Sequence, residues 1–458
     1  MSALRRSTSR VGLGSASGSQ GSVVVIVVLP FGADCRARTP PLATPPSPLG
    51  WPREWGGRRV SEIRLDAAAR RAVLDALDRF ARERLAPAAQ AIDDAGTFPT
   101  ALYRTAGELG LFGLWIPEEY GGTGPDLVTP LLVSERLARE SVAFAVTVSN
   151  CGDCATPIVR GGGKAAKDAY LPGIAAGTLV PAFCLSEAGG GSDVAAMRTT
   201  ARRNGGDYVI DGRKMWITSA PVADLFVVFA KTDPEAGHKG ISGFVVPRGT
   251  PGLSIGPAEE LLSLRGSPTA EVVFEGVRVP AAMRLGAEGD GFALAMATLD
   301  ESRLNIAAVA LGAATTAVDT AVTYAQGRVA FGKPIIEHQG LQFLLADLAA
   351  GLAAARALWE KAVQVLARGP SRQAGTYAAM TKLIATDLAM KAAIDAAEVL
   401  GGYGLSRAYP VARLLRDCKA LQIFEGSNEI QRWLIGRQLR KSGLVLEELD
   451  QGRFEPSS

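Results

Sequence analysis

The chain has 458 residues, a net charge of only +3 and 47% apolar residues. Its length exceeds that of one average domain, and its apolar content is sufficient for buried cores. The first sixty residues hold eight arginines against Asp34 and Glu54. The rest of the chain therefore has no basic excess of the kind that nucleic-acid-binding proteins show, and we expect no nucleic-acid partner.

The cysteine and histidine counts exclude further classes. Five cysteines, an odd number spread along the chain, do not form a disulfide framework and indicate a reducing compartment. Cys151 and Cys154 form a C-x-x-C without a second pair, so we interpret them as small buried side chains. The chain has only two histidines, His238 and His338, so a multi-histidine metal site or a Ser-His-Asp triad is not expected, and we predict no metal.

Residues 1–60 do not resemble a packed domain. An Arg- and Ser-rich start precedes the apolar run 22–30 and a Pro-rich linker. The run is too short to span a bilayer, and we predict no membrane partner, while a secretory segment and an organelle transit peptide stay open. We favour a disordered extension or a start codon assigned too far upstream. The protein is then cytoplasmic if bacterial, and a mitochondrial matrix protein if the segment is a transit peptide.

The pattern becomes helical after this segment. Val73, Leu77 and Phe80 recur on one face of a helix that Asp66 can cap and that Pro87 is expected to end. The stretch 131–141 is amphipathic again. We predict an N-terminal α-helical domain.

Short β-rich runs follow. Tyr208–Ile210 precede Asp211-Gly212, which predicts a hairpin whose second strand is 214–218. Further runs at 225–230, 241–246 and 270–274 predict an antiparallel, barrel-like β-domain.

Long Ala- and Leu-rich helices are predicted at 292–326, 339–368 and 372–400, with breaks at Pro334 and Gly369-Pro370. Their apolarity predicts a four-helix bundle that can share its core with other subunits. The expected fold class is α+β multidomain, divided as follows: a disordered or leader extension at 1–60, an N-terminal α-helical domain at 61–180, a middle β-domain at 181–290, a C-terminal α-helical bundle at 291–442 and a tail at 443–458.

Glu425 is a candidate general base. It stands between Ile423-Phe424 and Gly426, where apolar neighbours can exclude water and raise its pKa, and the glycine allows a ligand to approach the backbone. The alternative is an ordinary surface glutamate at a helix start.

Two glycine-rich stretches are candidate ligand loops. Residues 401–404 (GGYG) follow a long helix and allow close approach by a flat or phosphorylated ligand, although a helix C-cap explains them equally well. The loop 184–193 offers backbone N–H groups to an anion or a ring edge. Trp216 with Thr218 offers a stacking plane beside a hydroxyl, or is a core tryptophan.

Together these stretches resemble the acyl-CoA dehydrogenase family of flavoproteins. Four segments carry the resemblance: CLSEAGGGSDVAA (184–196), RVAFGKPIIEHQ (328–339), EVLGGYGLSRAYPVARLLRD (398–417) and IFEGSNEIQR (423–432). The similarity covers roughly residues 61–441. The sequence departs from the family pattern at Glu398, Leu405 and Ala408, which affects details of the cofactor and substrate contacts.

The resemblance implies that Glu425 removes the α-proton of an acyl thioester while FAD accepts the β-hydride at flavin N5. The thioester oxygen would be stabilised by the backbone N–H of the base and a ribityl hydroxyl. Some relatives place the base just before an arginine on another helix, a position that is Ser302 here. Glu425 is therefore the matching base.

The resemblance also implies the other site residues. The cofactor-binding residues would be Phe183, Leu185, Ser186, Trp216, Ile217, Thr218, Ser427 and Glu429, together with residues that hold the FAD of a neighbouring subunit, namely Arg328, His338, Gln339, Glu398, Gly401 and Gly402. The substrate contacts would be Ser192, Asp300, Arg303 and Gly426.

The implied partners are an acyl-CoA, an electron-transfer flavoprotein and further copies of the chain in a homotetramer, a dimer of dimers. SRLNIAA (302–308) and RGSPT (265–269) favour short or branched acyl groups. Three alternatives stay open: a dehydrogenase of carrier-protein-bound acyl groups, a flavin monooxygenase or oxidase on the same fold, and a non-catalytic binding protein.

Overall fold

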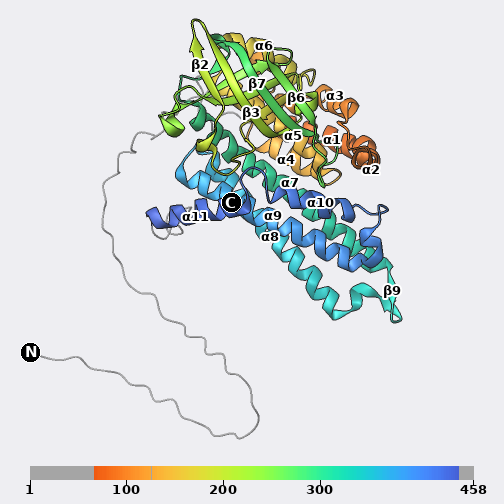
Figure 1. Ribbon diagram of the computed structural model, residues 1–458. Coiled ribbons are helices and arrows are strands. Elements are labelled where there is room, and N and C mark those ends of the chain that lie inside the picture. The colour runs from red at the N-terminus through yellow and green to blue at the C-terminus, as the bar shows by residue number, and fades with distance from the viewer. Residues whose placement is uncertain (1–66, 125, 443–458) are drawn as a thin grey trace, which may run out of the picture. The chain divides into compact units, whose positions relative to one another are not determined.

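The structure, a computed structural model, describes residues 67–124 and 126–442. The expected extension at 1–60, the tail at 443–458 and the cap by Asp66 lie outside the described residues. Within these ranges the elements follow the predicted order of helices, sheet and helices, and Figure 1 shows the sheet lying against the helices on one of its faces.

The N-terminal helices differ from the prediction at Pro87. That residue occupies the first turn of α2, where a missing N–H costs nothing, so the helix continues to Ala95 and ends at Gly96 with φ 63°. The elements are α1 (Ala67–Phe80), the π-helical stretch η2 (Ala81–Leu85), α2 (Ala86–Ala95), α3 (Thr100–Glu108), η3 (Leu111–Trp115), η4 (Glu118–Tyr120), α4 (Val128–Ala138), α5 (Val142–Gly161) and α6 (Lys164–Ala175).

The middle sheet is mainly antiparallel, as predicted, but it is open along the order β6-β7-β3-β2-β4-β5-β8, with β1 paired to β4, so the barrel-like closure was wrong. Its elements are β1 (Pro181–Cys184), η5 (Val194–Ala196), β2 (Thr200–Asn204), β3 (Asp207–Thr218), η6 (Ala220–Val222), β4 (Leu225–Lys231), η7 (Gly237–Gly240), β5 (Ile241–Pro247), β6 (Leu253–Ala258), β7 (Thr269–Pro280), η8 (Ala281–Met283) and β8 (Arg284–Leu285).

The hairpin predicted at Asp211-Gly212 was also wrong. β3 runs through both residues, and a register shift against β7 lies between Ile210 and Gly212. A Cβ on Gly212 would come within 2.5 Å of the Thr199 hydroxyl. The glycine therefore marks a β-bulge with close backbone approach, not a turn.

The C-terminal helices agree with the predicted ranges to within two residues. α7, α8, α9 and α10 pack against one another as a four-helix bundle, and α11 packs on α9. The elements are α7 (Gly291–Gly327), β9 (Val329–Ala330), β10 (Lys333–Pro334), η9 (Ile335–Glu337), α8 (Gln339–Leu366), α9 (Arg372–Leu400), η10 (Gly401–Leu405), α10 (Val411–Leu421) and α11 (Asn428–Ser442).

Helix α5 connects the cores. One apolar cluster joins the N-terminal helices to the C-terminal bundle, a second lies within the sheet, and a third joins α5 and α6 to strands of the sheet and to α7. The buried α5 therefore brings the sheet and the bundle together around the start of α7.

Among residues 67–124 and 126–442, three helices are long and apolar enough to cross a membrane by length and composition alone: α5, α7 and α8. The apolar windows of α5 and α7 are 94% and 67% buried inside the protein, whereas that of α8 is 17% buried. Helix α8 thus presents an apolar surface that the single chain does not cover.

Candidate active site

Glu425 lies in the connection between α10 and α11, and its backbone has the strained value φ 56°. Such a conformation persists only where the surroundings hold it. Two side chains bind its carbonyl oxygen: Arg303 Nε donates at 3.4 Å and Gln431 Nε2 at 3.2 Å. Gln431 also donates to the next carbonyl, that of Gly426, at 2.8 Å.

Lys382 supports the same turn from α9. This fully buried lysine donates from Nζ to the Gly426 carbonyl and to Asn428 Oδ1, both at 2.9 Å. Burial lowers the pKa of Lys382 to about 7, although the nearby Glu425 carboxylate opposes this shift. The turn that carries Glu425 is therefore fixed by groups from α7, α9 and α11.

The carboxyl group of Glu425 has an oxygen, Oε2, that is buried and makes no hydrogen bond within the described residues. Burial raises the pKa of Glu425, while the charges of Arg303 and Lys382 and the nearby Ser302 hydroxyl lower it. A carboxylate that is desolvated but kept ionisable by two cations is suited to accept a proton from carbon. The structure corrects one detail: Ile423 is 59% exposed, so burial of Glu425 comes from the packed helices rather than from that side chain.

Arg303 and Asp300 lie one turn apart on α7, beside Glu425. Arg303 Nη1 bonds Asp300 Oδ1 at 2.5 Å. Burial raises the pKa of Asp300, and the Arg303 charge opposes this rise. The two predicted substrate contacts therefore form an ion pair at the base, which reduces the free charge of Arg303.

The predicted flavin loop and strand lie side by side. Met215 N donates to Ser186 O at 2.9 Å, and the fully buried Lys214 donates to Leu185 O at 3.0 Å and to Glu187 Oε1 at 2.9 Å. These bonds bring the Phe183–Ser186 segment to the Trp216–Thr218 end of β3.

Trp216 itself fits a ring-binding role. Its side chain is 54% exposed and its backbone has φ 64°, an unusual value for a tryptophan. The adjacent Ile217 is only 1% exposed. An exposed aromatic plane held in a strained conformation beside a loop of backbone amides suits a flat heterocycle.

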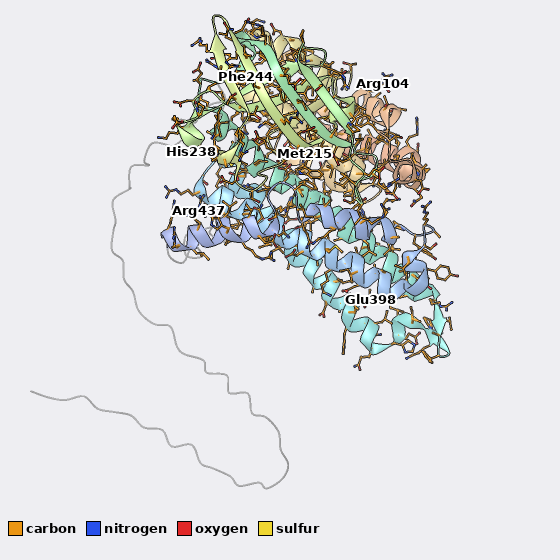
Figure 2. All side chains as sticks on the ribbon, in the orientation of Figure 1. Arg104, Met215, His238, Phe244, Glu398 and Arg437 are labelled. Carbon is orange, nitrogen blue, oxygen red and sulfur yellow. The ribbon has the colours of Figure 1, made fainter. Side chains whose placement is uncertain are left out.

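A second group of predicted cofactor residues gathers at the end of α9. A hollow of about 570 Å³ is lined by Arg328, Glu398, Gly401 and Gly402. In Figure 2, Glu398 lies in the bundle, well away from Met215 on β3, the strand predicted to contact the flavin. The two groups of predicted cofactor residues are therefore far apart within a single chain.

The remaining predicted residues are placed as follows. Ser192 is exposed in the glycine-rich loop, His338 and Gln339 do not line the hollow, and Glu429 is exposed on the first turn of α11. Ser427 accepts a hydrogen bond from Ile430 N at 3.4 Å, so it acts at the start of α11. Their roles toward a cofactor or substrate stay predictions.

Sequence reasoning missed two groups near the base. Lys382 sits inside an Ala-rich helix and Asp153 inside the C-x-x-C, so neither pattern pointed to Glu425. Cys151 and Cys154 are free and buried, as expected, and no group of three metal-ligating side chains occurs in the part of the chain that the structure describes.

A helix–sheet–helix chain with a carboxyl group that has a buried, unpartnered oxygen, and with an exposed aromatic ring beside a loop of backbone amides, has the features expected of an enzyme that binds a flat organic cofactor. Family models match almost all of the described chain: the acyl-CoA dehydrogenase N-terminal domain at residues 67–178, the middle domain at 182–277 and the C-terminal domain at 289–440. The chain belongs to the acyl-CoA dehydrogenase family.

Similar proteins agree with this assignment. The chain is 45% identical to an acyl-CoA dehydrogenase of Bacillus subtilis over 79% of this chain and 95% of the relative. Butyryl-CoA dehydrogenase from Megasphaera elsdenii matches with a TM-score of 0.78 and 38% identity, covering 81% of this chain and 98% of that one. A chain of the solved structure described as the electron transferring flavoprotein of Acidaminococcus fermentans matches with a TM-score of 0.78 and 40% identity, covering 81% and 97%.

Proposed function

We propose that this chain, an FAD-dependent acyl-CoA dehydrogenase, oxidises a short or branched acyl-CoA to the trans-2-enoyl-CoA with Glu425 as the base. The observation that carries the proposal is the buried, unpartnered Oε2 of Glu425 on a strained turn. When bound, FAD supplies the acceptor for the hydride from Cβ.

The chain's own residues prepare the other half of the reaction. Glu425 accepts the α-proton, and Arg303 and Lys382 keep it ionisable in spite of its burial. Packing of α7, α9 and α11 around the turn fixes the carboxylate before substrate arrives, so little reorganisation is needed during the reaction.

The backbone of the same turn serves the thioester oxygen. Glu425 N–H donates to no acceptor in the ranges that the structure describes, so it is free to donate to an oxygen that gains negative charge. The turn requires glycine at Gly426, because its φ is 84° and a Cβ there would lie 2.7 Å from Gln431 Nε2. We propose that the backbone left bare by this glycine is where the thioester approaches. We assign Asp300 and Arg303 to the orientation of the substrate and Ser192 to its pantetheine arm.

For the cofactor we assign Phe183, Leu185, Ser186 and the Trp216–Thr218 segment to the flavin of the same chain. We assign Ser427 and Glu429 to FAD as well. The residues assigned to the FAD of a neighbouring subunit are Arg328, His338, Gln339, Glu398, Gly401 and Gly402. The separation of Glu398 from Met215 supports such sharing.

A shared site requires an assembly, and we propose a homotetramer. Helix α8 supports this, because its apolar window is 17% buried and Phe343 on it is 61% exposed. We further propose a cytoplasmic location, and that electrons leave through an electron-transfer flavoprotein. We retain the division at 61–180, 181–290 and 291–442 as the domain organisation.

The test is anaerobic bleaching of the flavin absorbance by a panel of acyl-CoAs from isobutyryl to octanoyl, on the wild type, Glu425→Gln and the exposed control Glu118→Gln. We expect one chain class to bleach the wild type and the control, with loss of at least about 10²-fold in rate for Glu425→Gln. A Glu425→Gln protein that binds FAD and acyl-CoA normally and keeps its rate would falsify the role of Glu425. A yellow protein that no acyl-CoA bleaches would favour carrier-bound substrates or the oxygenase alternative.

A further inference from the structure

A second carboxyl group lies beside the proposed base. Asp153 is on α5, and every other residue from 142 to 159 is buried. Asp153 alone is partly accessible, so there is unfilled space next to it on a helix whose neighbouring residues are covered by the rest of the protein. Because α5 packs against α7, we place this space beside α7, on which Ser302 and Arg303 lie.

Three side chains meet at this space. The Ser302 hydroxyl lies close to both Asp153 and Glu425 and favours the ionised form of each. Yet Ser302 is only 1% exposed, and its oxygen makes no hydrogen bond of good geometry within residues 67–124 and 126–442. A buried hydroxyl without a partner and the orphaned Oε2 of Glu425 both indicate that a polar group of a ligand belongs here.

Asp153 has no cation of its own. Its side chain forms no ion pair within residues 67–124 and 126–442, and the Ser302 hydroxyl is the neighbouring group that favours its ionised form. The nearby cations are engaged elsewhere, since Arg160 pairs with Glu301 and Arg303 pairs with Asp300. Burial and the Glu425 charge therefore raise the pKa of Asp153 well above its usual range. A carboxyl group whose pKa is raised in this way can both donate and accept a hydrogen bond when it is protonated.

The position indicates which part of a substrate would meet this acid. The proposed role of Glu425 places it at the α-carbon, and Asp153 interacts electrostatically with Glu425 from the facing helix α5. On the proposed function, acyl-chain atoms beyond Cβ are then the substrate atoms nearest to Asp153. A plain alkyl chain there removes water from the acid without replacing its hydrogen bonds, which is unfavourable.

We propose that Asp153 is a specificity-determining residue of the acyl site, which takes acyl groups bearing a hydroxyl or similar hydrogen-bonding substituent beyond Cβ in preference to plain alkyl chains. This inference rests on the proposed function and narrows its substrate class. Ser302 supplies a second hydrogen-bonding partner for such a substituent.

The test compares two substrate pairs of matched length, butyryl-CoA with 4-hydroxybutyryl-CoA and hexanoyl-CoA with 6-hydroxyhexanoyl-CoA. Kcat and KM are measured for the wild type, Asp153→Leu, Asp153→Asn and the surface control Asp168→Leu. We expect the wild type and the control to favour at least one hydroxyacyl substrate by about tenfold or more in kcat/KM. Asp153→Leu should reverse this preference, and Asp153→Asn, which still hydrogen-bonds, should keep much of it.

Each outcome bears on the inference. A wild type that prefers alkyl chains in both pairs, or an Asp153→Leu variant with an unchanged preference, would overturn it while leaving the dehydrogenase function standing. If neither member of either pair nor any other acyl-CoA bleaches the flavin of any variant, the proposed function itself fails. Flavin content of each variant separates a selectivity change from misfolding, and Asp153→Asn, nearly isosteric, keeps the test valid if the leucine variant does not fold.

Discussion

Replacing Lys382 by Met tests how the strained turn at Glu425 is held. Methionine fills much of the volume of the lysine stem but cannot donate the two 2.9 Å hydrogen bonds to Gly426 O and Asn428 Oδ1. A hydrogen bond contributes about 0.5–1.5 kcal/mol when its donor is neutral and about 1.5–3 kcal/mol when the donor is charged, and Lys382, with a pKa of about 7, is in both forms at pH 7. Neither acceptor is left unpaired, because Gln431 still donates to Gly426 O and Thr386 to Asn428 Oδ1. We therefore expect a loss of about 2–4 kcal/mol in the free energy of unfolding.

The same change acts on catalysis. The Lys382 charge lowers the pKa of Glu425, so its removal raises that pKa further and less of the base is ionised at a given pH. The acidic limb of the kcat/KM profile should move to higher pH. Because Lys382 is charged mainly below its pKa of about 7, the difference between variant and wild type should be largest in that range.

The linkage gives a second signature. The pKa of Lys382 is about 7 in the folded chain against an ordinary value of 10.5, so between these values the unfolded chain binds more protons. Stability from this group therefore rises with pH across that window and is lost as pH falls through 7. The stability gap between wild type and Lys382→Met should widen from pH 7 to pH 9.

The assays are urea unfolding at both pH values and kcat/KM against pH. The matched control is Lys391→Met on the same helix, which removes an exposed lysine paired with Asp395 and should cost at most about 1 kcal/mol. If Lys382→Met is as stable as this control and its pH profile does not move, the lysine does not hold the turn and the reasoning is refuted.

Three further predictions follow from other parts of the chain. Lys214→Met should weaken FAD binding, since it removes the bonds that hold the 185–187 loop to β3; the ratio of flavin to protein absorbance measures this, and the exposed Arg213→Met is its control. Gly212→Ala should lower the free energy of unfolding by about 1–3 kcal/mol, because its Cβ would lie 2.5 Å from Thr199 Oγ1; equal stability to Gly206→Ala, which meets nothing within 4 Å, would contradict the bulge argument. Phe343→Asp should shift the assembly to smaller species in light scattering if α8 lies in a subunit interface, whereas an unchanged mass would exclude that surface.

The sequence by itself determined the order of the elements and pointed to Glu425 as the proposed base. The long helices were predictable because they are Ala- and Leu-rich runs, and Pro334 and Gly369 mark their boundaries in the sequence. The segment 423–432 indicated Glu425 as the proposed base through its resemblance to the family motif, since a carboxylate beside a glycine alone also fits a surface glutamate at a helix start. Pro87 and Gly212 were misread, since a proline at a first turn and a glycine at a bulge resemble a stop and a turn locally.

The tertiary structure alone decided what surrounds the base. Asp153, Lys382 and Glu425 are separated by more than forty residues along the chain in each case, and only the packing of α5, α7 and α9 brings their groups together. Periodicity assigns such residues to a helix but not to a neighbour. A polar side chain on a buried face becomes functional only through the group it faces, and that pairing depends on how helices from distant parts of the sequence pack.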